Sequence, residues 1–368
     1  MPAVPVLASP ADMETVRTDV ESILADFLDR KAKAAVAQRM PSEATEVLRE
    51  FLLSGGKRLR PVLCVTGWHA AGGHGGIAPV LRVAAALEMF HAFCLIHDDV
   101  MDHSDTRRGR PAVHKALAAL YRGGRTPAAA DDVGAAAAVL VGDLALVWSD
   151  ELLNGHDENG HDKGLSQVRR SRVLPLIDLM RTEVMYGQYL DLTATGRPTD
   201  DVERALAIIR HKTAKYTVER PLHIGAALGG ADQQLLRRLS EFALPLGEAF
   251  QLRDDLLGVF GSEKETGKPA LDDLRAGKHT VLAALALRAC DIDQARLLRN
   301  LYGNPGLDED GAASLRTVLQ ATGAPRRVES MIRERHDQAL THLQDTPLPG
   351  QVREWLRKMA DQAVWRNA

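Results

Sequence analysis

HDDVMDHSDTRRG, residues 97–109, is the stretch from which the rest of the chain is best understood. Asp98 and Asp102 are four residues apart, so a helix places both carboxylates on one face, about 6 Å apart along its axis. Two neighbouring anions need a cation, and hard oxygen ligands with room for water suit Mg²⁺. Asp99 points to one side, where it can serve the outer shell of such a site. The spacing therefore predicts a magnesium site at a helix end.

Two arginines follow these acids in the same stretch. The planar guanidinium groups of Arg107 and Arg108 suit phosphate. A Mg²⁺ ion held by carboxylates beside an arginine is a typical binding site for a diphosphate. The alternative is a solvated, acidic helix end. The apolar run directly before the acids, residues 93–96, argues against that alternative because it favours burial of this part of the helix.

Composition narrows the class of protein. The chain has 368 residues, of which 45% are hydrophobic and 26% charged, with a net charge of −3, so it has enough apolar surface for a sizeable core. This charge argues against a nucleic-acid binder and against an anionic membrane surface as the main partner. Cys64, Cys94 and Cys290 lie far apart without metal-ligand spacing. No basic-then-apolar leader opens the chain. The longest apolar stretch, residues 135–148, is too short and too Ala-rich for a membrane-spanning helix, so we expect a cytoplasmic protein.

Helix-forming residues dominate the chain, and no run of alternating β-branched residues stands out. The pattern predicts a single all-α domain over residues 1–368, with a loose tail at 1–8 and a flexible insertion at 154–166. Residues 121–132 are expected to form a loop. The main predicted helices cover residues 43–53, 78–102, 133–153, 168–192, 200–228, 232–260, 279–290, 293–302 and 312–321, followed by two helices between 325 and 367.

A second acidic site occurs in QLRDDLLG, residues 251–258. Asp254 and Asp255 follow an apolar helix, as the first acids do. Taken alone, two adjacent acids at a helix surface are common. Two acid-rich helix ends that face one cavity would hold several Mg²⁺ ions around one diphosphate.

Basic residues gather in four places, each of which taken alone fits a solvated surface. They lie after the double glycine Gly55-Gly56, after the first acids, on a predicted helix, and after the second acids: Lys57, Arg58 and Arg60; Arg107 and Arg108; Lys212 and Lys215 around Thr213; Lys268 and Lys278. Together they would hold two polyanionic groups, one through Mg²⁺ and one by direct ion pairs. No Walker A pattern indicates a nucleotide. His91, seven residues before Asp98, is either a core histidine or a donor to a phosphate oxygen.

With these motifs in place, the chain resembles the trans-isoprenyl diphosphate synthases of the polyprenyl synthetase family. The matching motifs run from Gly55-Gly56-Lys57-Arg58 to Lys278, and include Gly187-Gln188, Lys212-Thr213, Phe250-Gln251 and Gly267-Lys268. The resemblance implies an all-α fold of about a dozen helices around a deep cavity, usually as a homodimer. It also implies Mg²⁺-dependent condensation of isopentenyl diphosphate with an allylic diphosphate.

The resemblance also assigns the site. The residues it makes catalytic are Asp98, Asp99, Asp102, Asp254 and Lys212. Of these, Asp98, Asp102 and Asp254 would ligate Mg²⁺ on the allylic diphosphate. The same diphosphate would be contacted by Arg107, Lys212, Gln251 and Lys268, with Lys278 also expected to bind substrate. Isopentenyl diphosphate would be held by Lys57, Arg60, His91 and Arg108, and Thr213 would line the cavity near the reacting carbons.

Product length in this family depends on the floor of the cavity. Phe93 stands five residues before Asp98, about 7 Å lower on the helix axis, and Phe90 lies about one turn below that. The alternative is that both rings pack the core. The first motif has two residues between Asp99 and Asp102, without an insertion, which resembles geranylgeranyl diphosphate synthases and favours a twenty-carbon over a fifteen-carbon product.

One departure from the family pattern leaves other functions open. The second motif usually ends in Asp, where this chain has Gly258. A slow enzyme or a non-catalytic subunit of a heteromeric synthase is one alternative, although the first acids are intact. A farnesyl diphosphate synthase is a second. A class I terpene cyclase is a third, but it needs no isopentenyl site, and Ser262 stands where its second motif requires Glu.

Overall fold

The computed structural model describes residues 13–155, 165–261 and 271–365. The tail predicted at 1–8 and most of the insertion predicted at 154–166 lie outside these residues. The described chain is all-α apart from one short hairpin, as the composition predicted. It divides into two compact units, Met1–Pro175 with Pro221–Asp232, and Leu176–Arg220 with Gln233–Ala368. The single domain expected from the sequence stays a prediction.

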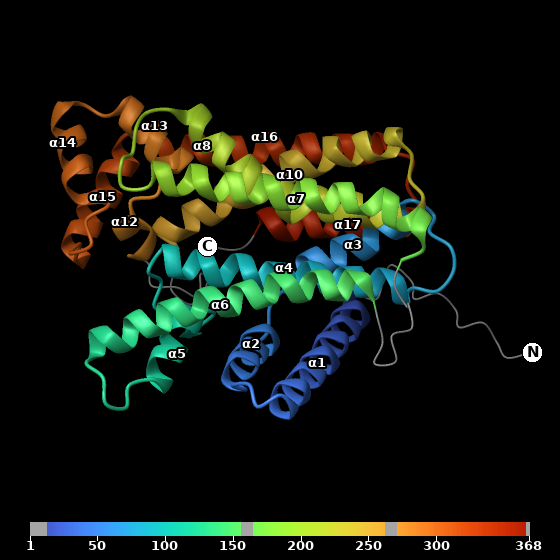
Figure 1. Ribbon diagram of the computed structural model, residues 1–368. Helices are drawn as coiled ribbons and strands as arrows, with labels where there is room; N and C mark the ends of the chain where they lie inside the picture. The colour runs from blue at the N-terminus through green and yellow to red at the C-terminus, as the bar shows by residue number, and fades with distance from the viewer. Residues whose placement is uncertain (1–12, 156–164, 262–270, 366–368) are drawn as a thin grey trace, which may run out of the picture. The chain divides into compact units, whose positions relative to one another are not determined.

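The first unit is organised around one buried helix, α4, which packs against α1, α3 and α6 (Figure 1). α4 is long and apolar enough to cross a membrane, but 67% of its most apolar window is buried, as is typical of a core helix. It ends at the first acid motif, so the core of this unit fixes the place of those acids. The elements of the unit are α1 (Met13–Ala37), α2 (Glu43–Leu53), α3 (Leu59–Ala70), α4 (Ala78–Met101), β1 (Thr106–Arg107), β2 (Arg110–Pro111), α5 (Val113–Leu120) and α6 (Pro127–Asn154).

The second unit is organised around α10, which packs against α16 and α17 (Figure 1). It also packs against η1. The helix α10 ends at the second acid motif. The elements that lie wholly in this unit are α8 (Val202–Ile208), η1 (Ile209–Glu219), α10 (Gln233–Phe260), α12 (Asp272–Ala276), α13 (Val281–Ala289), α14 (Ile292–Leu301), α15 (Glu309–Ala321), α16 (Ala324–Asp345) and α17 (Gly350–Val364). Two further helices, α7 (Gln167–Ala194) and α9 (Arg220–Gly229), continue from one unit into the other.

The predicted loop at 121–132 is wrong in its second half. There α6 begins at Pro127, and the Thr126 side chain caps it by accepting a hydrogen bond from the backbone N–H of Ala129. Proline suits the first position of a helix, where no N–H is needed. The helical run predicted at 200–228 is present, but its centre, η1, is a π-helix of 11 residues.

Candidate active site

The first acid motif gathers around a single guanidinium group. Asp99 is fully buried and accepts from Arg107 Nε at 2.9 Å, with a further bond from the Arg107 terminal nitrogen. The same nitrogen lies 3.3 Å from Asp98 Oδ2. Burial opposes the charge on Arg107, but the hydrogen bond to Asp99 and the charges of Asp98 and Asp102 outweigh it and raise the Arg107 pKa. Asp99 therefore positions Arg107, while Asp98 keeps 17% of its side chain exposed.

The hairpin after α4 separates the two adjacent arginines. Thr106 pairs with Pro111 and Arg107 with Arg110, which leaves Arg108 and Gly109 as a two-residue turn with φ of 55° and 71°. Positive φ at both positions is the geometry of a type I′ turn. The Arg107 side chain reaches the acids. Arg108 instead donates to the carbonyl oxygen of Gly55, on the glycine loop.

The glycine loop, residues 54–58, makes room for Arg108. A Cβ atom on Gly56 would lie 3.0 Å from the Arg108 guanidinium carbon, closer than side chains normally approach. Gly56 also has φ of 136°, which disfavours any other residue. The double glycine thus brings the Lys57–Arg60 segment next to Arg108.

His91 lies within this basic region. Burial and the positive charges of Arg60, Arg108 and Arg107 lower its pKa well below 6.5, so its imidazole is neutral at neutral pH. The converging positive charges fit a polyanion, and a neutral imidazole can still donate one hydrogen bond to it.

Arg58 has a different role from its neighbours in the basic cluster. Its side chain is 1% exposed and pairs with the buried Glu88 at 2.8 Å and with Glu21 at 3.0 Å. A buried arginine with two carboxylate partners stabilises the folded unit and is not available to bind substrate. Arg58 ties the glycine loop to α4 and α1.

The two phenylalanines proposed as a floor are both buried in the first unit. Phe90 is 1% exposed and Phe93 9%. Their ring centroids are 5.4 Å apart, and the Phe93 ring lies 4.6 Å from that of His97. Phe90 has the burial of a core residue. The floor role of Phe93 stays a prediction.

In the second unit, Lys212 and Thr213 lie on η1, which is approached closely by α7 at Gly187 and by α10 at Gly247. A Cβ atom on Gly187 of α7 would lie 2.4 Å from the backbone nitrogen of Lys212, and one on Gly247 of α10 would lie 2.5 Å from Ala214 Cα. Only glycine allows both neighbours to approach so closely. Lys212 Nζ is held by Asp191 Oδ2 at 2.5 Å.

The second acid motif is linked to η1 by a short chain of hydrogen bonds. The Thr213 hydroxyl donates to Gln251 Oε1 at 2.8 Å, and Gln251 Nε2 donates to Asp255 Oδ1 at 2.8 Å. Burial, together with the charges of Asp273 and Asp254, raises the Asp255 pKa to about 7. The motif thus concentrates negative charge where a cation would be favourable.

Of the two lysines after this motif, the structure describes one. Lys278 Nζ lies 3.9 Å from Asp273 Oδ1, so it belongs to the same charged group as the second motif. Lys268 falls outside the described residues.

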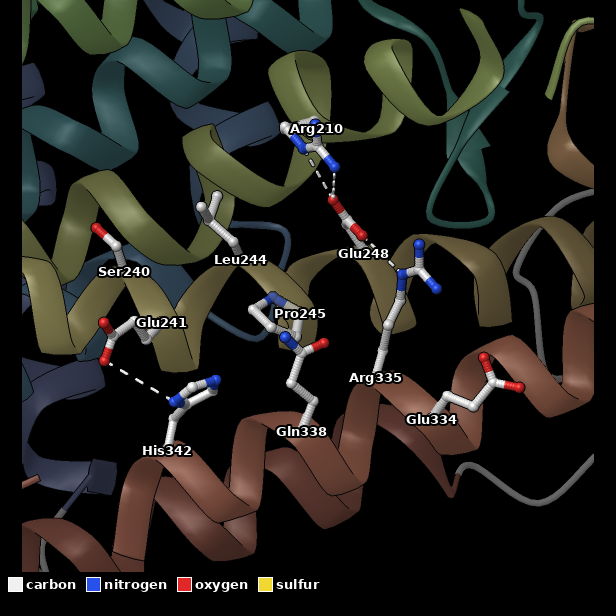
Figure 2. A pocket seen from close by; sticks show the side chains of 10 residues that line it. All are labelled: Arg210, Ser240, Glu241, Leu244, Pro245, Glu248, Glu334, Arg335, Gln338 and His342. Atoms are coloured by element: carbon white, nitrogen blue, oxygen red, sulfur yellow. Dashed lines mark hydrogen bonds and ion pairs between the residues drawn. The ribbon is translucent and has the colours of Figure 1, made fainter. Parts of the chain in front are cut away.

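A separate pocket of about 580 Å³ lies among α10, α16 and η1 in the second unit (Figure 2). Figure 2 shows Glu248 between two arginines. Its carboxylate oxygens lie 2.8 Å from an Arg210 nitrogen and 2.6 Å from Arg335 Nε. Of the predicted site residues that the structure describes, none lines this pocket. The buried Glu248 instead ties η1 to α10 and α16.

The residues present fit a metal that binds together with a diphosphate. Within the described ranges, no three His, Cys, Asp or Glu side chains gather into a group that holds a metal alone. Mg²⁺ is typically bound through one or two carboxylates plus substrate phosphates. Asp98 and Asp102 are partly exposed and offer hard oxygen atoms at the end of α4. An open site of this kind suits that mode of binding.

Sequence reasoning named the acids and bases of each motif but did not name the residues that contact and support them. Asp191, Gly247 and Asp273 were not singled out, although Asp191 lies one helical turn after the Gly187-Gln188 motif. The expectation that the two acid motifs face one cavity stays a prediction, because each motif is described within its own unit.

Comparison with known proteins identifies the family. A model of the polyprenyl synthetase family matches residues 41–319. The chain is similar to a geranylgeranyl pyrophosphate synthase from Corynebacterium glutamicum, solved in complex with isoprenyl diphosphate and magnesium. It shares 39% identity and a TM-score of 0.89 with that structure, over 98% of this chain and 100% of that one.

Two characterised relatives align over most of their own lengths. The farnesyl diphosphate synthase of Geobacillus stearothermophilus is 34% identical over 304 residues, which cover 80% of this chain and 90% of the relative. The geranylgeranyl diphosphate synthase of Saccharolobus solfataricus is 30% identical over 310 residues, which cover 82% and 83%. The match of the family model over most of the chain, together with these relatives, shows that this chain belongs to the polyprenyl synthetase family.

Proposed function

We propose that this polyprenyl synthetase is a Mg²⁺-dependent prenyltransferase that condenses isopentenyl diphosphate with an allylic diphosphate to make geranylgeranyl diphosphate. The observation that carries the proposal is the arrangement at the end of α4. There Asp98 and Asp102 stay partly exposed while the buried Asp99 holds Arg107 in place. Carboxylates for a metal beside an oriented guanidinium group are what a diphosphate requires.

The family resemblance assigns three acids and two positively charged side chains to the allylic diphosphate. Asp98, Asp102 and Asp254 would hold Mg²⁺, which when bound withdraws charge from the leaving diphosphate. Arg107 and Lys212 are each held by a carboxylate, Asp99 and Asp191, so both cations are positioned before substrate arrives. Preorganised charge of this kind favours a transition state in which the diphosphate gains negative charge.

Isopentenyl diphosphate would lie in the basic region of the first unit. Lys57, Arg60 and Arg108 would supply positive charge, and neutral His91 would donate a hydrogen bond. The double bond of this substrate would attack the allylic carbon as the diphosphate leaves, and the departed diphosphate would take up the released proton. Apolar walls must keep water away during this step, because water would convert the allylic group into an alcohol.

A twenty-carbon product is supported by two observations. The Corynebacterium glutamicum structure, at 39% identity, is that of a geranylgeranyl pyrophosphate synthase. Phe93, five residues before Asp98, is buried beside His97 and Phe90, as a floor residue would be. The relatives also include a farnesyl diphosphate synthase, so product length needs a direct measurement.

The test is an assay with radiolabelled isopentenyl diphosphate and, in turn, dimethylallyl, geranyl and farnesyl diphosphate. We expect Mg²⁺-dependent incorporation of label and a main product that runs with geranylgeranyl diphosphate on chromatography. A main product of fifteen carbons would assign the farnesyl enzyme instead. Cyclised hydrocarbon without incorporation of label would assign a cyclase, and no reaction would favour a non-catalytic subunit.

We also propose that the protein is a cytoplasmic homodimer. Cys64, Cys94 and Cys290 lie far apart in the sequence without disulfide-framework or metal-ligand spacing, which fits a reducing compartment. On α6, Leu140 and Val147 are 65% and 60% exposed and lie seven residues apart, on one face of the helix. By light scattering we expect a dimer for the wild type and a monomer for the L140E/V147E variant. A V36E variant, changed at a 66% exposed position on α1, should stay dimeric. A monomeric wild type would contradict the proposal.

A further inference from the structure

The glycine loop, residues 54–58, has a backbone conformation that needs support from outside. Gly55, Gly56 and Arg58 have positive φ, of 103°, 136° and 47°. Arginine has a Cβ atom, so the left-handed region in which Arg58 lies is disfavoured for it. Backbone in such a region persists where contacts from the surrounding structure hold it. The loop leads directly into α3, which carries Arg60, so these contacts also determine how α3 begins.

Two of the supporting contacts come from one face of α1. Arg17 Nε donates to the carbonyl oxygen of Lys57 at 3.2 Å. Glu21 Oε1 accepts a hydrogen bond from Arg58 Nε at 3.0 Å. Arg17 and Glu21 are four residues apart, which places them on the same face of the helix. The helix α1 therefore holds two consecutive residues of the loop, the first by its backbone and the second by its side chain.

The remaining contacts hold other parts of the loop. Arg108 donates to the carbonyl oxygen of Gly55, and Glu88 of α4 accepts from Arg58 Nη1 at 2.8 Å. Neither of these contacts involves the carbonyl group of Lys57. Loss of Arg17 would therefore remove a restraint on the peptide unit between Lys57 and Arg58 that these two contacts do not replace.

The groups that Arg17 contacts belong to the protein. Its Nε is bonded to the loop, and its Nη1 pairs with Glu14 of the same helix at 3.1 Å. The helix α1 ends at Ala37, before residues 41–319, which the family model matches. A task for Arg17 at the substrate site thus comes from the structure of this chain and lies outside the matched region.

We propose that Arg17 and Glu21 of α1 are positioning residues for the isopentenyl diphosphate site, because they hold the glycine loop in the conformation from which Lys57 and Arg60 contact the diphosphate. This inference rests on the proposed function, which assigns Lys57 and Arg60 to that substrate. Arg17 and Glu21 act through the loop. Loss of either should weaken binding of isopentenyl diphosphate and leave binding of the allylic diphosphate nearly unchanged.

The first test measures binding of isopentenyl diphosphate without turnover. No condensation occurs without an allylic substrate, so isothermal titration calorimetry gives the Kd directly. We expect Arg17→Ala to raise this Kd about 3- to 10-fold, which corresponds to the net contribution of one hydrogen bond. Lys33→Ala removes the same charge from an exposed position on α1 and should leave the Kd unchanged. Equal Kd values for R17A and K33A would overturn the inference.

Steady-state kinetics separates positioning from a general loss of structure. For R17A the KM for isopentenyl diphosphate should rise by about the same factor as the Kd. The KM for geranyl diphosphate and kcat should stay near the wild-type values, because the change removes binding of one substrate only. If both KM values rise equally, α1 only supports the fold of its unit, and the positioning role is wrong.

The second test asks whether both residues act through the same loop. Glu21→Ala should also raise the Kd for isopentenyl diphosphate, whereas Asp26→Ala, at an exposed position on α1, should not. In R17A/E21A the Kd should rise by less than the product of the two single factors, because either change already releases the loop. Factors that multiply would show independent action and contradict the inference.

These measurements also distinguish failure of the inference from failure of the proposed function. A wild type that binds and condenses isopentenyl diphosphate, beside an R17A variant of wild-type Kd, would leave the proposed function standing and remove only the role of α1. A wild type that does not bind isopentenyl diphosphate would overturn both.

Discussion

Neighbouring acids in the first motif have different tasks at the scale of single residues. Asp99 is buried and bound to Arg107, whereas Asp98 keeps accessible carboxylate oxygen. The sequence predicted this division, because helical spacing places Asp98 and Asp102 together and Asp99 aside. It did not separate Arg58 from Lys57 and Arg60, because the buried partner Glu88 lies 30 residues away in the chain.

Replacing Asp98 tests this division directly. Asp98→Ala should lower kcat by at least about 100-fold, because preorganised charge at the leaving group is lost. Helical content should stay near that of wild type, because the side chain is not part of the core. Steady-state kinetics and far-UV circular dichroism measure both. Near-normal turnover of the variant would show that Asp98 is not a metal ligand.

Phe93 tests the proposed floor. Phe93→Ala should open space below the first motif, so chains longer than the wild-type product should appear on chromatography. Phe90→Ala is the matched control. Its ring is more deeply buried, so we expect lower stability from it before any change in product. If F93A makes the same product as the wild type, Phe93 is a core residue and does not set product length.

His91 makes stability depend on pH. Its pKa is held far below 6.5 in the folded state by burial and by the nearby arginines. Below pH 6.5 the unfolded chain takes up a proton that folded His91 does not, so the free energy of unfolding should fall as the pH drops. Urea titrations between about pH 5 and pH 7.5 should show a shallower dependence for His91→Gln than for wild type. An identical slope in both proteins would contradict the assignment.

At the scale of elements, η1 determines where Lys212 and Thr213 lie. Gly187 and Gly247 have no side chains, so α7 and α10 can approach η1 closely. Glu248 of α10 pairs with Arg210 of η1 and with Arg335 of α16, and so links the three helices. The sequence predicted a helix here but not a π-helix, because the apolar pattern that marks a helix does not report which carbonyl each N–H reaches. The close approach of Gly187 and Gly247 to η1 is a tertiary contact, which that pattern does not contain. Insertions of this kind often mark functional positions in helices.

Gly247 offers a test of this packing. Gly247→Ala places a Cβ 2.5 Å from Ala214 Cα, which is backbone and cannot move aside cheaply. We expect a loss of about 1–3 kcal/mol in the free energy of unfolding, the usual cost of overpacking, together with lower turnover. Gly350→Ala meets nothing within 4 Å at the start of α17 and is the matched control. A G247A variant as stable and active as G350A would show that the close contact is not needed.

At the scale of the whole molecule, the all-α class and the order of helices followed from composition and periodicity. The acid motifs were also found, because each terminates a buried helix, α4 or α10, whose apolar run is visible in the sequence. The sequence did not predict that the carboxylate of Asp273 approaches Gly258. It comes from α12, and only the folded chain brings Asp273 to that position.

The central claim is that metal held by these acids drives departure of the allylic diphosphate. The most direct measurement is turnover of wild-type protein with labelled isopentenyl diphosphate and geranyl diphosphate, first in EDTA and then as Mg²⁺ is added back. We expect no product in EDTA and full recovery on addition of Mg²⁺, with D98A needing far more Mg²⁺ than wild type. Product formed at the same rate in EDTA, or equal Mg²⁺ dependence for wild type and D98A, would contradict the account.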